Sequence, residues 1–436
     1  MGALVFGGVF ARGWANIAYG ILILWGLVWW IVAVMDRRSL QPNWLPLPPT
    51  RWAVSLGVFV LTWLLAVLAG GNPVAGLGTL ALLLYPLILP LLVWPIFSRW
   101  PGWPIRLRFL WGLGLIVVAF LTFREGGYQL GCLRAKAYLG VIDLGSVLGQ
   151  LIPVTVAALL MALSLGRRRE TAFFGLALVA ASLALTQNCS RQTLLTVPAL
   201  NLLILWVYRH HFTDNPRRRF LVLAFILALL TLLPLAVGGG QRFLETLECE
   251  RTSDTLNASD IYQITHGAGS EPAPAPSASN VPQVKPDPGF CSVALNSSDT
   301  LRVNLWRLGW KTFMEHPLLG QGPGSSFQLV EPGKEERTVH HVHNVFIYVL
   351  AQTGLMGFFG LLTLHLAPLS LLWHHRRSRD QETFFWVWAA FAVNLQLVLN
   401  GLTDQVFGLK AMMYVHWIVT AAALWQTQRP QKEASE

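Results

Sequence analysis

Apolar runs of about 20 residues recur along this 436-residue chain, and they constrain its fold more than any other feature. A helix rises about 1.5 Å per residue, so about 20 apolar residues cross about 30 Å of hydrocarbon. Only 12% of the residues are charged, whereas soluble domains carry about 25%. The sequence therefore predicts an all-α polytopic membrane protein.

Eleven runs are long enough to be spans, and an extra half-helix within residues 1–35 would make twelve. The predicted spans cover residues 15–35, 52–70, 74–98, 106–123, 141–165, 172–187, 192–208, 220–238, 344–372, 383–400 and 411–426. We expect three regions. They are an N-terminal transmembrane bundle (1–238), one large periplasmic loop (239–343), and C-terminal transmembrane helices with a short cytoplasmic tail (344–436).

The net charge of +10 would also suit nucleic-acid binding, but its distribution argues against that function. Most basic residues flank alternate loops between apolar runs, so all of them can face the cytoplasm. These are Arg37, Arg38, Arg51, Arg99, Arg106, Arg108, Arg167, Arg168, Arg169, Arg209, Arg217, Arg218, Arg219, Arg376, Arg377, Arg379, Arg429 and Lys432. The intervening loops, including 239–343, must then face the outer side.

All four cysteines fall on the predicted outer side, where an oxidising compartment allows disulfides. Cys249 and Cys291 are the natural pair within the large loop, and Cys132 with Cys189 is a second pair. Four unpaired thiols near the interface are the alternative, because connectivity does not follow from sequence.

The large loop has two distinct parts. Residues 267–289 are rich in Pro, Ala and Ser, which predicts a flexible segment. Residues 300–316 place apolar side chains at helical spacing, which predicts an amphipathic helix at the outer interface, capped by Ser298 or Asp299.

Several cations lie on the outer side, where the charge bias of the loops does not explain them. Arg191 starts a span after a very short turn, and Arg302 starts the amphipathic helix. Arg134 and Lys136 share another outer loop. A guanidinium binds two oxygens of a phosphate at once, so these residues are candidates for a diphosphate site. Snorkelling to the interface is the alternative for each.

A second group of candidates lies where the large loop re-enters the membrane. His343 is a candidate general base because imidazole titrates near neutral pH, and His341 and Asn344 are candidates for orienting an acceptor. A structural role and a metal site are the alternatives; the spacing of the histidines is poor for zinc, so we predict no metal. Asp404, in a later outer turn, could orient a histidine or a sugar hydroxyl, or pair with an outer arginine.

No Walker A motif is present, and no Asp-x-Asp pair faces outward, so neither ATP hydrolysis nor a metal-held nucleotide sugar is indicated. We therefore predict no cofactor. An exporter or flippase of lipid-linked glycans is disfavoured because the candidate cations gather on one side instead of spreading through the membrane.

The segment 298–360 resembles the O-antigen ligase and O-antigen polymerase superfamily, and most closely its ligases. An arginine precedes a Leu-Trp helix, a His-Pro-Leu-x-Gly-x-Gly turn follows, and then His-Asn-x-Phe with Gly-Leu-x-Gly. Ser190 and Arg191 are similar to the family's Ser-Arg at the outer end of a span. The insertion 267–289 looks peculiar to this chain.

The resemblance implies an inner-membrane glycosyltransferase of a Gram-negative bacterium whose active site faces the periplasm and needs neither metal nor nucleotide. It implies a glycan on undecaprenyl diphosphate as donor and lipid A-core as acceptor. An O-antigen polymerase or a protein O-oligosaccharyltransferase would use the same donor, and no motif names the acceptor.

Overall fold

The computed structural model describes residues 49–100, 102–125, 141–188, 190–211, 221, 224, 288–329, 337–404 and 410–429. Its long helices are α3 (Thr50–Ala69), α4 (Pro73–Arg99), α5 (Trp103–Glu125), α6 (Val141–Ser164), α7 (Arg168–Asn188), α8 (Arg191–Tyr208), α12 (Pro288–Glu315), α13 (Val345–Trp373), α14 (Gln381–Gly401) and α15 (Lys410–Gln428). The shorter elements are the 3-10 turn η1 (Arg209–His211) and the strands β1 (Phe327–Leu329) and β2 (Arg337–Val339).

The prediction of an all-α polytopic membrane protein is confirmed. Among the described residues, seven helices are long and apolar enough to cross a membrane: α3, α4, α5, α6, α7, α13 and α14. Lipid offers no partners for backbone amides, so each span satisfies them within its own helix. Every predicted span that falls in the described part of the chain is a helix. The predicted span 15–35 and nearly all of 220–238 lie outside it.

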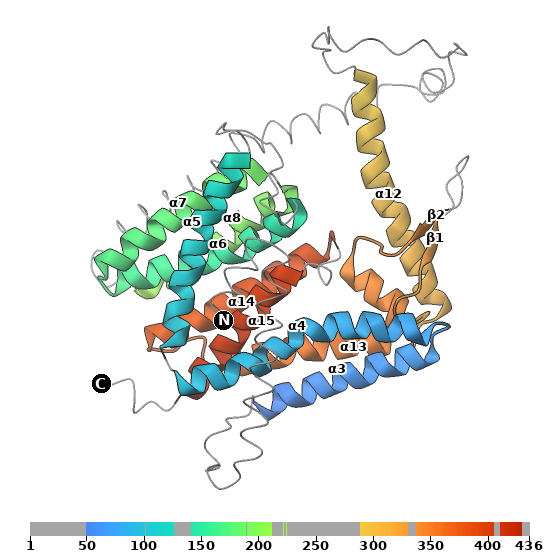
Figure 1. The fold of residues 1–436 in the computed structure, drawn as a ribbon, viewed down its shortest axis with the longest axis horizontal. Helices are drawn as coiled ribbons and strands as arrows, with labels where there is room; N and C mark the ends of the chain where they lie inside the picture. The colour runs from blue at the N-terminus through green and yellow to red at the C-terminus, as the bar shows by residue number, and fades with distance from the viewer. Residues whose placement is uncertain are drawn as a thin grey trace.

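The helices form two packed groups that share α15 (Figure 1). On one side α3, α4 and α13 run side by side, and on the other α5 to α8 gather around α6. The central helix α6 is almost fully enclosed by its neighbours, since 94% of its apolar stretch is buried. Helices α14 and α15 contact each other and bridge the two groups, with α15 packing on α4 and α14 packing on α6.

Helix α13 is broken at Gly354, where φ is 62° and ψ is −164°. The turn that follows α12 occupies this break. The amides of Leu355 and Met356 donate to the carbonyls of Pro317 and Leu318 at 2.8 and 3.1 Å. In return, the amides of Gln321 and Gly322 donate to carbonyls of α13 at 2.9 and 3.0 Å. The turn thus satisfies backbone groups that the break releases, which joins the large loop rigidly to α13.

The amphipathic helix predicted over 300–316 is present, but its predicted start is wrong. Helix α12 begins at Pro288, so Ser298 and Asp299 lie inside it and do not cap its start. Leu305 and Phe313, on one face, are buried, and α12 packs on α13. The strands β1 and β2 pair antiparallel and carry the chain from the turn back to the histidines. Figure 1 shows that the N-terminal part of α12 projects away from the bundle.

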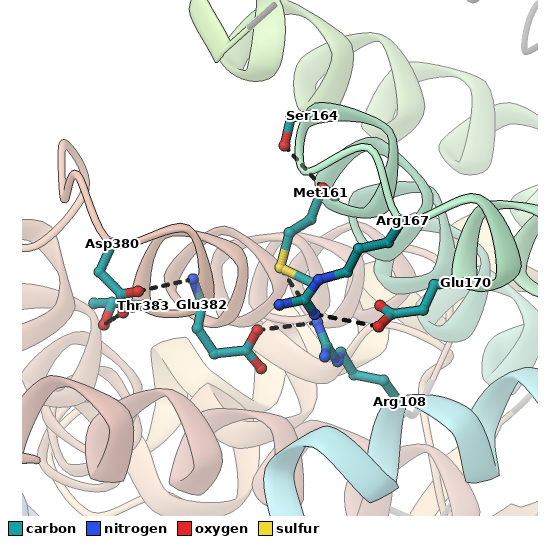
Figure 2. A network of polar contacts seen from close by, with 8 residues as sticks. All are labelled: Arg108, Met161, Ser164, Arg167, Glu170, Asp380, Glu382 and Thr383. Atoms are coloured by element: carbon teal, nitrogen blue, oxygen red, sulfur yellow. Dashed lines mark hydrogen bonds and ion pairs between the residues drawn. The ribbon is translucent and has the colours of Figure 1, made fainter. Parts of the chain in front are cut away.

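The end of the bundle where α5 and α14 begin holds a buried ion pair (Figure 2). A guanidinium nitrogen of Arg108 lies 3.1 Å from a carboxylate oxygen of Glu382, and the Arg108 side chain is fully enclosed. Arg108 lies in the second turn of α5, near the loop that it was predicted to flank, but its burial over the ring of Phe385 was not predicted. Arg167, in the connection between α6 and α7, and Glu170, in the first turn of α7, lie beside this pair.

Replacing Glu382 with glutamine is expected to destabilise the fold by about 3 kcal/mol, because it leaves a buried guanidinium without its counter-charge. Thermal unfolding in detergent measures the loss. The double replacement Arg108→Leu/Glu382→Leu removes both charges and is expected to recover most of the stability. Glu315→Gln, in the exposed Lys311–Glu315 pair, should change little. A Glu382→Gln protein as stable as the unmodified one would contradict this account.

Candidate active site

His343 lies at the turn between the strand hairpin and α13. Its φ of 51° makes it the one non-glycine residue with a positive φ among the described residues. Such a conformation costs about 1–3 kcal/mol and points to a role for the side chain that it orients. The indole of Trp306, on α12, donates to the His343 carbonyl at 3.3 Å and helps to hold this backbone.

The side chain of His343 pairs with Asp404. Its Nδ1 lies 3.3 Å from Oδ1 of the carboxylate, and the two side chains are 30% and 16% exposed. Asp404 follows the end of α14, where its amide donates to the Asn400 carbonyl at 3.0 Å. When Nδ1–H donates to the carboxylate, Nε2 carries the lone pair that can accept a proton. Two residues 61 positions apart therefore form an oriented imidazole.

His341 packs edge-to-face against His343, with ring centroids 4.2 Å apart. Burial, and then the nearby His343, lower the pKa of His341 below its usual value. A neutral His341 therefore lies beside His343 at neutral pH and does not compete with it for the proton.

Asn344 caps the start of α13 and also fixes the end of α14. Its side-chain oxygen accepts from the amides of Phe346 and Ile347, both at 3.0 Å. Its amide nitrogen donates to the Leu402 carbonyl at 3.0 Å. Both the oxygen and the nitrogen of the Asn344 side chain are therefore engaged. We infer that Asn344 fixes the start of α13 against the end of α14, and so fixes the positions of His343 and Asp404 relative to each other.

The start of α8, where Arg191 is the first helical residue, lies at this same end of the bundle. The next residue, Gln192, donates to the carbonyl of Leu399 near the end of α14 at 3.4 Å. Ser190, the residue before Arg191, closes against Gly145, where an added Cβ would lie 2.6 Å from the Ser190 Cβ. The start of α8, which includes the backbone of Arg191, thus contacts α14 about one helical turn before Asp404.

Arg302 lies on α12 with an exposed side chain. It precedes Trp306 by one helical turn, so both residues share the face of α12 from which Trp306 reaches His343. The role of Trp306 was not predicted. The Leu-Trp pair in the motif after Arg302 was the signal that could have found it.

The remaining predicted site residues lie outside this description. Residues 126–140, which include Arg134, Lys136 and Cys132, are not among the described residues, nor are Cys189 and Cys249. Cys291 lies in α12, but its side chain is not described. The disulfide pairs stay predictions. Within the described residues no group of three His, Cys, Asp or Glu side chains could hold a metal ion.

The fold and these residues define a polytopic membrane protein with a His–Asp pair at one end of its bundle. The family model described as O-antigen ligase matches residues 174–362, which include α8, α12, the histidines and most of α13. This match supports membership of the chain in the O-antigen ligase and polymerase superfamily. Asp404 lies beyond the matched residues. No curated protein matches the chain at a significant level.

Proposed function

We propose that this protein is an O-antigen ligase that transfers glycan from undecaprenyl diphosphate to lipid A-core on the periplasmic face of the inner membrane. The family membership supports a transferase of lipid-linked glycans. The observation that carries the proposal is the pairing of His343 Nδ1 with Asp404 at 3.3 Å, beside the start of α8.

The chemistry needs one base and several cations. Nε2 of His343 takes the proton of an acceptor hydroxyl while that oxygen attacks the anomeric carbon of the donor. The bond from this carbon to the diphosphate oxygen breaks, and the diphosphate leaves with the bonding electrons. Direct displacement inverts the anomeric centre. Asp404 holds the imidazole and stabilises the imidazolium that forms.

Arg191 and Arg302 bind the donor diphosphate, with Arg134 and Lys136 as further contacts. Negative charge grows on the bridging oxygen as the glycosidic bond breaks. Fixed guanidinium groups therefore stabilise the transition state more than the ground state. The donor is already activated by its diphosphate, so the reaction requires no nucleotide and no metal.

The test uses the purified chain with undecaprenyl-diphosphate-linked glycan and lipid A-core, in EDTA and without nucleotide. A mobility shift of the lipid A-core that Arg191→Ala removes would support the metal-independent ligase. Longer glycan on the lipid carrier, without that shift, would identify a polymerase instead. An intact donor with neither product would contradict the proposal and favour transport or a protein acceptor.

The polymerase is the second candidate because the family includes both activities. Both would use the same donor and the same base. They differ in the acceptor, which is a second lipid-linked glycan for the polymerase.

Asp404→Asn is expected to lower kcat by about 10²–10⁴-fold, because an amide does not hold the imidazole in the productive tautomer. The KM for the donor should stay nearly unchanged, since Asp404 does not bind the diphosphate. Steady-state kinetics of glycan transfer measure both. Glu315→Gln, an exposed carboxylate at the end of α12, is the matched control and should behave like the unmodified protein. A full rate in Asp404→Asn would exclude its positioning role.

A further inference from the structure

A pocket of about 640 Å³ lies at the opposite end of the bundle from His343. It forms where α8 and α13 end and α14 begins, and it is lined by both aromatic and basic side chains. The proposed function does not involve it. Its size is within the usual range for small-molecule sites, about 300–1,000 Å³.

The apolar part of the pocket is made by tryptophans from three helices. Trp206 and Trp373 are 57% and 49% exposed, which is unusual for so large an apolar ring unless it faces lipid. Trp388, on α14, also lines the pocket, and its indole donates to the Arg376 carbonyl at 3.1 Å. This bond fixes the connection between α13 and α14 over the pocket.

The basic part of the pocket consists of arginines, two of which lie over these tryptophan rings. The guanidinium of Arg209 lies 4.4 Å from the ring centre of Trp206, and that of Arg376 lies 4.3 Å from Trp373. Arg377 and Arg379 also line the pocket and are exposed. One nitrogen of each guanidinium over a tryptophan is already engaged, because Nε of Arg209 donates to Nε2 of His210 at 2.9 Å and Nη1 of Arg376 donates to the Trp373 carbonyl at 2.8 Å. Contact with a tryptophan restricts each of these two guanidinium groups and leaves its remaining N–H groups available to an anion.

No carboxylate neutralises this group within the described residues. The acid adjacent in sequence, Asp380, is engaged as the cap of α14. Its carboxylate accepts from the amides of Thr383 and Glu382 at 2.8 and 3.4 Å. Four arginines therefore face one apolar pocket at the membrane surface, a combination that suits an amphiphile with a phosphate head and an apolar tail.

We propose that this pocket binds an anionic glycerophospholipid of the surrounding leaflet. The phosphate lies among Arg209, Arg376, Arg377 and Arg379, and an acyl chain lies along the tryptophan faces. A lipid with two phosphates, such as cardiolipin, binds more tightly than phosphatidylglycerol, because it meets more of the guanidinium groups. Orientation of the protein by its basic loops would need the charges but not the aromatic pocket.

Native mass spectrometry of the delipidated full chain tests the proposal, with cardiolipin, phosphatidylglycerol and zwitterionic phosphatidylethanolamine as probes. Arg377→Gln/Arg379→Gln is expected to weaken cardiolipin binding about 30-fold, which corresponds to about 1 kcal/mol for each arginine near a charged lipid surface. Val207→Trp, which fills the pocket from α8 without changing charge, is expected to weaken it as well.

The matched control is Arg168→Gln/Arg169→Gln, which removes the same charge from the exposed start of α7 at the same end of the bundle. It should bind cardiolipin like the unmodified chain. Equal losses in the control would mean general attraction to charge, and equal binding of phosphatidylethanolamine would mean no anion site. Either result overturns the proposal, as would unchanged binding in Val207→Trp. Displacement of cardiolipin by free glycerophosphate would assign the site to a soluble phosphate instead of a lipid.

Discussion

His343→Ala is expected to lower the rate of glycan transfer by at least about 10²–10⁴-fold, the usual contribution of a general base. The methyl group cannot accept the proton of the acceptor hydroxyl, and no other described imidazole is paired with a carboxylate. Binding of the lipid-linked donor should persist, because the cations proposed to hold its diphosphate lie on other elements. Single-turnover transfer and a separate donor-binding measurement give the two quantities.

His340→Ala is the matched control for this change. His340 is exposed, belongs to the same histidine cluster and lies just after β2, so its loss alters the local charge without touching the His343–Asp404 pair. Its rate should be close to that of the unmodified protein. Normal turnover in His343→Ala would end the assignment of the base, and loss of donor binding in that variant would indicate a structural role.

Gly354→Ala is expected to prevent stable folding of the large-loop region. The φ and ψ values of Gly354 belong to a region open essentially to glycine alone. An added Cβ would also lie 2.3 Å from the carbonyl carbon of Leu318, which is backbone and cannot move aside independently. The backbone strain alone costs about 1–3 kcal/mol, and expelling the turn would break its hydrogen bonds to α13. Yield of folded protein and its thermal midpoint in detergent report the effect.

Gly57→Ala provides the comparison, because Gly57 lies in the regular helix α3 and an added Cβ meets nothing within 4 Å. This change should leave stability the same or slightly higher, as alanine favours helix. A Gly354→Ala protein with an unchanged midpoint would mean that the break in α13 is not needed for the fold.

The spans could be predicted because crossing a membrane imposes a local requirement. Each run of about 20 apolar residues must be a helix whatever its neighbours are, since lipid leaves no other way to satisfy its backbone. The break at Gly354 was not predicted. The segment reads as one continuous apolar run, and the reason for the break lies in the turn at Pro317 and Leu318, which docks there. The burial of Arg108 was not predicted for the same reason, because its partner Glu382 is 274 residues away in the sequence.

The candidate site was predicted as a set of residues but not as an arrangement. His343 and Arg191 stand out because they are polar residues at membrane entries, which is visible in the sequence. That Asp404 contacts His343, and not an outer arginine, depends on Asn344 joining α13 to the end of α14. From the sequence, a histidine and an outer arginine were equally possible partners of Asp404.

Hydrophobic length and charge act locally, so the class of fold and the polar residues at the helix ends could be predicted from the sequence. Which helix ends meet depends on the tertiary structure. Hydrogen bonds between helix termini, such as those of Gln192 and Asn344, bring the start of α8, the start of α13 and the end of α14 together. Contacts of this kind arise from the packing of the whole bundle, so no single segment encodes them.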